Sequence, residues 1–351
     1  MNYKMKMKYK QILFIAGLPL LAACSEGPAS PLPDAADADV LRVLSVDTKE
    51  VGTRSVMTTA ELATDGAQIG VYAINPDKTE YLPPRGGSNT AVYTYNSSVW
   101  NAATVGTDLL RLPSATGKTV NVYAFYPSDL TSAYQSGGES YVSGVDILSE
   151  DDFKATSQAD YLYAGTVATG VCATSPAVSF EMNHALVKLT LKVYKSGSLT
   201  STMKLTGLKI NDNSGALKGG TGKRMRLSDG QLQGTVALSA ITLTAADDAQ
   251  KTEIVTYTDG STPTAFAFCL LAPAKVTYLS FLVTTATTGL EAGATTQTQQ
   301  FLTQQTLMTK TDWKAGEHVV LTIVLDGMKA TVTNISVRPW EDYTDSYYPI
   351  S

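Results

Sequence analysis

After its N-terminal segment, the chain has no long stretch with the 3.6-residue period of an amphipathic helix. Apolar runs of strand length recur instead, and Gly, Asn, Asp, Ser and Pro interrupt them at short intervals. Short strands separated by turn residues are typical of antiparallel β-sandwiches. The 46 Thr residues among 351 fit this pattern, because a β-branched, half-polar side chain suits strands with one face in water. We therefore predict an all-β chain.

Two runs show strand patterns most clearly. In 185–193, apolar residues alternate with Lys188, Thr190 and Lys192, which predicts a half-buried antiparallel strand. The run 319–325 is apolar on both faces, which predicts a central strand. Further strands are predicted at 68–74, 91–95, 119–126, 204–210, 265–271 and 278–284. A short helix is expected near 150–156, and the Thr/Gln-rich segment 284–305 is predicted to be a long hairpin or an exposed loop.

The first 24 residues have the pattern of an export signal. Four lysines precede an apolar run at 12–23, which is shorter than the roughly 20 residues that a membrane-spanning helix needs. The run ends in Leu-Leu-Ala-Ala followed by Cys24, as in a bacterial lipobox, in which the Cys is acylated. We expect 1–23 to be a lipoprotein signal peptide and Cys24 to carry acyl chains such as palmitate, which tether the exported protein to a membrane. The alternative is an ordinary secretory signal with an incidental Cys.

Charge and composition argue against several classes of function. The chain has 27 Lys and Arg against 32 Asp and Glu, a formal net charge of −5, which does not suit a nucleic-acid-binding surface. Two His and three Cys supply few ligands for metal sites and few bases for hydrolases. We therefore expect no enzyme activity, no cofactor, no metal and no nucleic-acid partner.

Two segments are similar to known ligand loops but lack essential residues. The segment 218–224 resembles a phosphate-binding loop, yet the first Gly of that motif is absent and Arg224 replaces the Ser or Thr that holds magnesium. The segment 211–215 is similar to a calcium loop, but Lys223 stands where the closing Glu is required. We predict a hairpin turn at the first segment and a turn at the second.

The His and Cys residues have structural interpretations. His184 and His318 stand at strand starts with no Ser or Cys nucleophile placed beside them, so both are expected to be structural. Cys172 and Cys269 either form one disulfide in an oxidising compartment or remain two free thiols.

A series of landmarks runs through the chain in a specific order. They lie at 66–73, 93–95, 100, 120–127, 159–164, 180–189, 313–317 and 335–340. Together with the lipobox, this order resembles the fimbrillin family of Bacteroidales, which comprises pilus subunits and related surface lipoproteins. The resemblance implies two transthyretin-like β-sandwich domains in tandem. A seam near 175–182 follows a Gly/Thr-rich stretch, and we place the domains at 55–178 and 179–351.

The resemblance also implies export as a lipoprotein, proteolytic removal of an N-terminal segment, and polymerisation by strand donation. The segment 24–54 would be the tether and removable strand, with the strand itself at 40–46. A trypsin-like protease would cut between Arg54 and Ser55. The candidate donor strand lies in 330–340, where four β-branched residues are predicted to line one face: Thr331, Thr333, Ile335 and Val337. The alternative is that this segment is the last strand of its own domain.

The resulting expectation is a structural subunit of a fimbrium (pilus) at the surface of the outer membrane, serving cell adhesion. Its partners would be other pilus subunits, identical copies or minor subunits, the outer membrane through the lipid, and host or bacterial surface ligands. The alternative is a permanently lipidated, monomeric surface protein: a pilus anchor, a tip or a glycan-binding adhesin. In that case aromatic side chains would stack on sugars, with four candidates: Tyr81, Trp100, Tyr134 and Tyr141.

Overall fold

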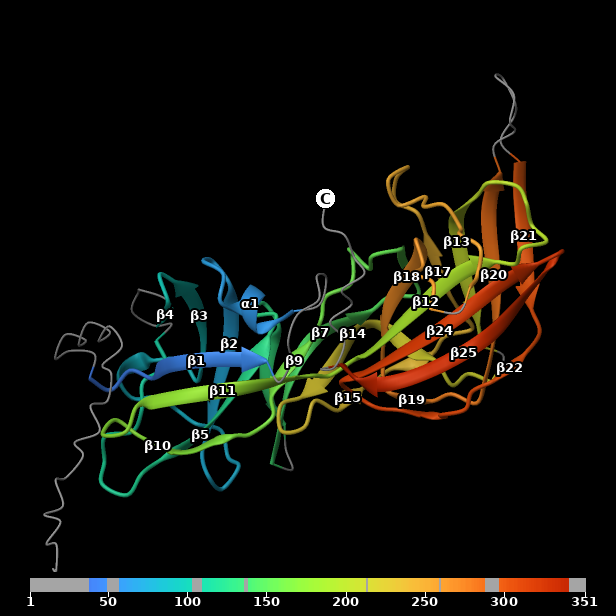
Figure 1. Cartoon of the computed structure of the whole chain (residues 1–351). Coiled ribbons are helices and arrows are strands. Elements are labelled where there is room, and N and C mark those ends of the chain that lie inside the picture. Colours follow the sequence, from blue (N-terminus) through green and yellow to red (C-terminus); the bar gives the residue numbers. More distant parts are fainter. Residues whose placement is uncertain are drawn as a thin grey trace, which may run out of the picture.

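The chain folds almost entirely into β-strands, which form two large sheets and two smaller ones (Figure 1). This computed structural model describes residues 38–48, 57–102, 109–135, 138–212, 214–258, 260–287 and 297–340. Within these ranges, helix is limited to α1 (Thr59–Leu62) and a 3₁₀ turn, η2 (Pro84–Gly86). The prediction of an all-β chain with two tandem β-sandwich units is confirmed.

The first large sheet lies mainly in the N-terminal half of the chain. In spatial order its strands are β1 (Arg42–Thr48), β11 (Ala177–His184), β9 (Leu162–Ala164), β5 (Val120–Tyr126), β2 (Gln68–Ile74), β3 (Thr90–Asn96) and β4 (Val99–Ala102), and β10 (Ala168–Val171) pairs with β5. The pairing of β1 with β11 is parallel, whereas the other pairings in this sheet are antiparallel.

Both faces of the central strand β2 are buried, which explains its continuous apolar sequence. Ile69 and Val71 point into a first core, which is centred on these residues with Leu62, Val122 and Phe180. Tyr72 and Ile74 point into a middle core on the opposite face. The middle core is centred on Tyr72, Phe125, Val142, Leu186 and Met225.

The second large sheet curves around its own core. Its spatial order is β18 (Ala265–Leu271), β12 (Val187–Lys195), β24 (Glu317–Asp326), β25 (Lys329–Pro339), β21 (Gln297–Thr303), β20 (Tyr278–Thr287), β13 (Met203–Asn211), β17 (Ala240–Thr244) and β8 (Glu150–Asp152), and β22 (Thr306–Leu307) pairs with β20. The second core between its two halves is centred on Leu189, Leu191, Phe281, Leu321 and Trp313. The central position predicted for 319–325 is confirmed, because β24 lies between β12 and β25. The hairpin predicted within 284–305 is also confirmed, since β20 pairs antiparallel with β21.

The prediction for 185–193 is wrong in one respect. β12 does alternate, but Lys188 and Thr190 on its second face are buried as well. The ammonium of Lys188 lies over the Phe268 ring, 4.8 Å from its centroid, and the Thr190 hydroxyl lies 2.8 Å from Nε2 of His318. β12 also pairs parallel with β24 on one side and antiparallel with β18 on the other. A buried aliphatic stem with a cation on an aromatic ring gives the same sequence pattern as an exposed lysine.

A third sheet joins strands from both halves of the chain. It contains β15 (Leu232–Gln233), β14 (Lys218–Arg226), β7 (Glu139–Ile147) and β6 (Thr131–Gln135), with β16 (Val236–Ala237) on β14. A two-stranded ladder pairs β19 (Ala274–Lys275) with β23 (Asp312–Trp313). Because β6 and β7 come from the N-terminal half and β14 to β16 from the C-terminal half, the third sheet links the two units.

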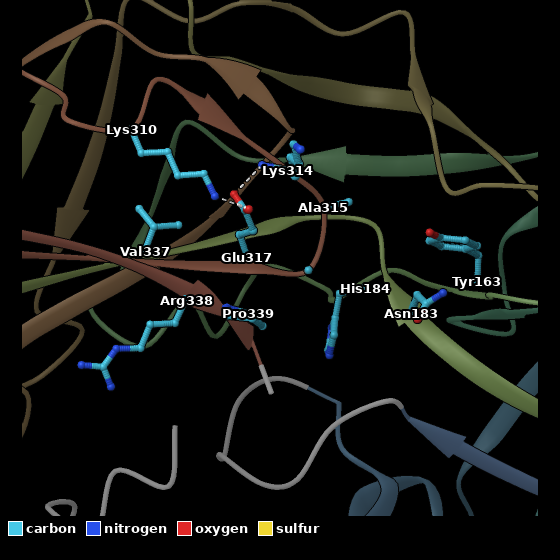
Figure 2. Close-up of a pocket in the computed structure, with 11 residues that line it drawn as sticks. Tyr163, Asn183, His184, Lys310, Lys314, Ala315, Glu317, Val337, Arg338 and Pro339 are labelled. Carbon is cyan, nitrogen blue, oxygen red and sulfur yellow. Dashed lines mark hydrogen bonds and ion pairs between the residues drawn. The ribbon is translucent and has the colours of Figure 1, made fainter. Parts of the chain in front are cut away.

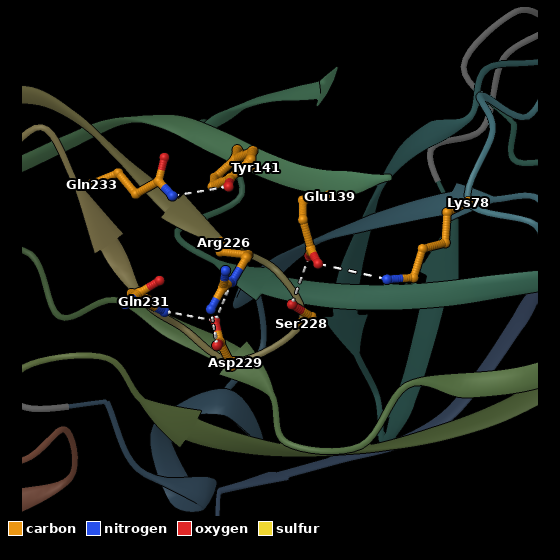
Figure 3. Close-up of polar contacts among 8 residues, drawn as sticks. All are labelled: Lys78, Glu139, Tyr141, Arg226, Ser228, Asp229, Gln231 and Gln233. Carbon is orange, nitrogen blue, oxygen red and sulfur yellow. Dashed lines mark hydrogen bonds and ion pairs between the residues drawn. The ribbon is translucent and has the colours of Figure 1, made fainter. Parts of the chain in front are cut away.

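Polar contacts hold one end of this third sheet against the first (Figure 3). Glu139 on β7 lies 3.6 Å from the Lys78 ammonium and accepts a hydrogen bond from the Ser228 hydroxyl. Arg226 on β14 pairs with Asp229, whose carboxylate also accepts from the backbone N–H of Gln231 and so closes the turn. These contacts are largely exposed, so their role is to fix the turn more than to stabilise the fold.

Two predictions of local structure, a hairpin turn at 218–224 and a short helix near 150–156, are wrong. The segment 218–224 is not a hairpin turn but most of β14, where Gly220 and Gly222 have positive φ and the register with β7 shifts. The segment 150–156 is not helical: it holds β8 and a turn in which the Asp152 carboxylate accepts from the backbone N–H groups of Lys154 and Thr156. The turn predicted at 211–215 is confirmed in its described residues, where Asp212 accepts from the backbone N–H of Ser214.

The passage between the two large sheets is very short. β11 ends at His184 in the first sheet and β12 begins at Val187 in the second. The two intervening residues, Ala185 and Leu186, are fully buried in the middle core. The predicted domain boundary at 178 lies within β11, and where the folding units divide stays a prediction. Among the described residues, no helix has the length and apolar character to cross a membrane.

Gly70 offers a test of how tightly the middle core is packed. A Cβ built on Gly70 would lie 2.2 Å from Cζ of the buried Phe125 ring. We expect Gly70→Ala to lower the free energy of unfolding by about 1–3 kcal/mol through overpacking. The matched control is Gly197→Ala, because a Cβ there meets nothing within 4 Å, and its effect should stay within about 0.5 kcal/mol. Denaturant unfolding measures both, and equal stabilities would contradict the packing described here.

His318 predicts a pH dependence of stability. Burial, and then the positive charges of Lys188, Lys192 and Arg338, lower the pKa of His318 from 6.5 to about 3. Between these values the unfolded chain binds a proton that the folded chain does not, so the contribution of this residue falls as pH drops from about 6.5 towards 3. His318→Gln should remove this part of the acid destabilisation. Unfolding free energies of both proteins across that range give the difference, and parallel pH profiles would contradict the prediction.

Candidate functional site

The first described strand, β1, lies at the edge of the first sheet (Figure 1). It pairs parallel with β11, from Arg42 opposite Ala177 to Thr48 opposite Met182, and β4 lies close on its other side. A strand predicted at 40–46 is thus present at 42–48. Its partner is distant in sequence, so the strand is held by pairing and side-chain packing rather than by a hairpin turn.

Three apolar side chains of this segment complete the first core. Leu41, Val43 and Val46 are buried there, whereas Leu44 is 63% exposed. The spacing departs from strict alternation because the register with β11 shifts between Val43 and Ser45. Burying a Val or Leu side chain contributes about 1.5–3 kcal/mol, so β1 leaves a substantial apolar groove if it departs.

Polar groups fasten the beginning of the segment. The Asp39 carboxylate lies 2.6 Å from Nη1 of Arg111, and the Asp39 carbonyl accepts from the backbone N–H of Leu112. The backbone N–H of Leu41 donates to the Leu110 carbonyl, and the buried hydroxyl of Tyr93 donates to the Leu41 carbonyl at 2.7 Å. The ion pair and these hydrogen bonds fix the position of the segment along the groove.

The other end of β1 meets helix α1. The backbone N–H of Thr48 donates to Oγ1 of Thr59 at 2.8 Å, and the two hydroxyl groups are 2.9 Å apart. Thr58 and Glu61 form a capping box that begins α1. The chain therefore leaves this point after Thr48 and returns to it by Met57. The predicted cleavage residues Arg54 and Ser55 fall in that interval, and they lie outside the described residues, as does the predicted lipidation residue Cys24.

The candidate donor segment forms β25, which pairs antiparallel with β24 along its length and with β21 only at Lys329 and Ala330. The prediction that four of its residues share one face is wrong. Ile335 and Val337 pack against the second core, whereas Thr331 and Thr333 are exposed. The reason is a register shift opposite the Thr322–Ile323 step of β24, which inserts one residue and reverses the alternation. Whether the segment acts as a donor strand stays a prediction.

The two units meet at a polar and aromatic cluster. Nδ1 of His184 lies 2.8 Å from Oδ2 of Asp160, which also accepts from the backbone N–H of Met57. The His184 ring stacks on Trp340 with centroids 4.1 Å apart. Met57 follows the predicted cleavage point and Trp340 directly follows β25, so this cluster connects the start of the region after that point with the C-terminal end of the described residues. His184 has a partner in this cluster, Asp160, and His318 has one in the second sheet, Thr190, in agreement with the structural role predicted for both.

A pocket of about 500 Å³ opens beside this cluster (Figure 2). Glu317 on its wall binds the Lys310 ammonium and accepts from the backbone N–H of Lys314, whereas the Arg338 side chain extends away from it. Gly316 links the connection between β11 and β12 to the end of β25, since its N–H donates to the Leu186 carbonyl and its own carbonyl accepts from the backbone N–H of Trp340. Among the described residues that line the pocket, none is Ser, Thr or Cys.

The structure answers two questions that the sequence leaves open: whether the four aromatic side chains can stack on sugars, and whether Cys172 and Cys269 form a disulfide. Tyr81, Trp100 and Tyr141 are buried, so the idea that they stack on sugars is wrong, and the Tyr134 side chain lies outside the described residues. Cys172 and Cys269 are both free. Burial raises the pKa of the Cys269 thiol to about 12.

The polar anchors of β1 were not predicted from the sequence. Asp39 belongs to an acidic, Pro-rich stretch that resembles a linker, and Arg111 stands isolated before Pro113. Their partnership depends on the return of the chain to the edge of the sheet, which residue spacing does not encode. The available signal was Asp39 itself, a charge placed directly before the apolar run 40–46.

Similar proteins support a common fold. A fimbrial protein of known structure from Bacteroides vulgatus superposes with a TM-score of 0.59 at 15% identity, covering 86% of this chain and 99% of that one. Proteins described as candidates for cell adhesion, from Bacteroides ovatus and Bacteroides uniformis, give TM-scores of 0.54 and 0.52 at 16% and 21% identity. They cover 86% and 87% of this chain and 97% and 100% of their own. No curated protein sequence matches the chain significantly.

Sequence similarity places the chain more specifically than the shared fold does. The family described as fimbrillin-like matches residues 53–340, which is most of the chain and nearly all of its two sandwich units. The matched region begins between β1 and α1, so β1 lies outside it. The protein therefore belongs to the fimbrillin-like family.

Proposed function

We propose that this protein is a structural subunit of an adhesive surface fimbrium, which matures by loss of β1 and polymerises by strand exchange. The observation that carries the proposal is the position of β1. It fills a groove of the first core at a sheet edge, and one cut anywhere between Thr48 and Met57 would leave it bound by non-covalent contacts alone. Fimbrillin-like family membership supports a pilus-related role in adhesion.

Loss of β1 would expose what another strand needs for binding. The backbone groups of β11 that pair with β1 would be unsatisfied, and the sites of Leu41, Val43 and Val46 would be open to water. An incoming strand restores the ladder and refills the apolar sites, which is the physical basis of β-augmentation.

We propose β25 as the donor, with Thr331, Thr333, Ile335 and Val337 in the exchanged segment. Its burial favours this choice over the central strands, because Ala330 is its only buried residue, whereas most of β24 is buried. Beyond Ala330, its second edge has no strand partner among the described residues. Its release therefore exposes less of the second core than release of β24 would.

The remaining steps of the proposal precede assembly. Cys24 would be acylated after removal of 1–23, and the lipid would hold the precursor at the outer membrane with its folded units at the cell surface. Cleavage after Arg54 would then free the subunit from the tether. Its partners would be further copies or other pilus subunits, together with host or bacterial surface ligands.

The proposed cleavage predicts a defined mature N-terminus. Limited treatment of the whole protein with a trypsin-like protease should give a stable product that starts at Ser55, because the strands on both sides are folded. Arg54→Gln should reduce this product at least tenfold, whereas the control Arg42→Gln, within β1, should not. Mass spectrometry of protein taken from cells gives the natural terminus. Acylated Cys24 as the only species would contradict the proposal and support the permanently lipidated monomer.

The proposed exchange predicts that fastening β1 prevents assembly. Asp47 and Glu181 are exposed and directly paired across β1 and β11, so cysteines there can form a disulfide. In a chain that also carries Cys172→Ser, the oxidised Asp47→Cys/Glu181→Cys protein should stay monomeric after cleavage and should polymerise once a reductant is added. The control with Asp47→Cys alone should polymerise under both conditions. Equal polymerisation of the oxidised and reduced double variant, measured by size-exclusion chromatography, would contradict strand exchange at this groove.

A further inference from the structure

The N-terminal end of the β1 groove carries a positive charge that faces a carboxylate. Arg111 and Asp39 contact each other at 2.6 Å, with side chains 13% and 11% exposed. A second guanidinium, that of Arg85, lies 3.9 Å from the other carboxylate oxygen of Asp39 and is mostly exposed. A largely buried ion pair with a hydrogen bond contributes more than a surface pair, because water screens it less.

The two partners lie on opposite sides of the proposed cut. Arg111 belongs to the part that remains, where its carbonyl accepts from the buried Tyr81 hydroxyl at 2.8 Å, and its backbone forms a β-bridge to Val40 of the part that leaves. Burial, and then the negative charge of Asp39, raise the pKa of Tyr81 to about 12, so this hydroxyl stays protonated and keeps donating. Asp39 belongs to the part that leaves. Departure of β1 therefore removes the carboxylate and leaves the guanidinium in the groove.

Asp39 also has a fixed place relative to the apolar residues that fill the groove. It lies two residues before Leu41, and Val43 and Val46 follow at spacings set by the register shift. A replacement strand that pairs parallel to β11 places its carboxylate beside Arg111 only if it has the same spacing between that carboxylate and its apolar side chains.

We propose that Arg111, with Arg85 beside it, selects the strand that refills the groove by binding a carboxylate two residues before the first apolar side chain that enters the first core. The preferred partner is thus a β-strand of a different subunit, with an acidic residue at that position and in parallel orientation to β11, because β25 of an identical copy has no Asp or Glu. This inference rests on the proposed function, since it assumes that the groove is vacated. It adds a chemical criterion for the occupant, which apolar burial alone does not supply.

The experiment uses the whole chain with a site for a sequence-specific protease inserted after Arg54. After cleavage and mild-denaturant removal of the N-terminal piece, the groove is titrated with a fluorescent peptide of residues 38–48. Asp39→Asn in the peptide should weaken binding about tenfold, which corresponds to about 1.4 kcal/mol. The matched control is Asp47→Asn in the same peptide, an equal change of charge at an exposed position, which should change affinity less than twofold.

Variants of the protein locate the effect at Arg111. With Arg111→Gln, the wild-type and Asp39→Asn peptides should bind within twofold of each other, and Arg111→Lys should restore part of the difference. Equal weakening by Asp39→Asn and Asp47→Asn would overturn the inference, as would a difference that persists in Arg111→Gln. Failure of every peptide to bind would instead contradict the proposed function, because the groove would then not be available to a strand.

Discussion

Burial of the first sheet on both faces is the constraint on which the remaining structure depends. One face of β2 and β5 encloses the first core, and the other packs on the third sheet through the middle core. The third sheet in turn draws its strands from both halves of the chain. Because both faces of the first sheet are buried, its middle strands need the third sheet on one side, and β1 closes the first core at the edge of the sheet.

The contacts of β1 divide into two kinds with different consequences. Leu41, Val43 and Val46 supply apolar burial, which any strand of suitable side chains could supply. The Asp39–Arg111 pair and the Tyr93 hydrogen bond supply position, because each requires a particular atom at a particular depth. Affinity and register are therefore set by different residues. A groove of this kind can hold its first occupant firmly and still distinguish among replacements.

The sequence predicted the strands better than their surroundings. Runs such as 68–74 and 265–271 were located correctly because a short, continuous apolar run is a local signal. The buried face of β12 was missed, since Lys188 meets Phe268 only after distant strands pair. The reversed facing within β25 was missed because a one-residue register shift leaves no trace in composition. For the candidate site, the strand β1 was predicted from its apolar run. The ion pair of Asp39 with Arg111 was not predicted, because it depends on the path of the folded chain.

The two-residue passage from β11 to β12 has a mechanical consequence. Ala185 and Leu186 are fully buried, and the Leu186 carbonyl accepts from Gly316, which itself holds Trp340 at the end of β25. Because this joint has no exposed linker, bending there would have to open the buried contacts of the middle core. If such subunits form a fibre, its flexibility would reside in the contacts between successive subunits.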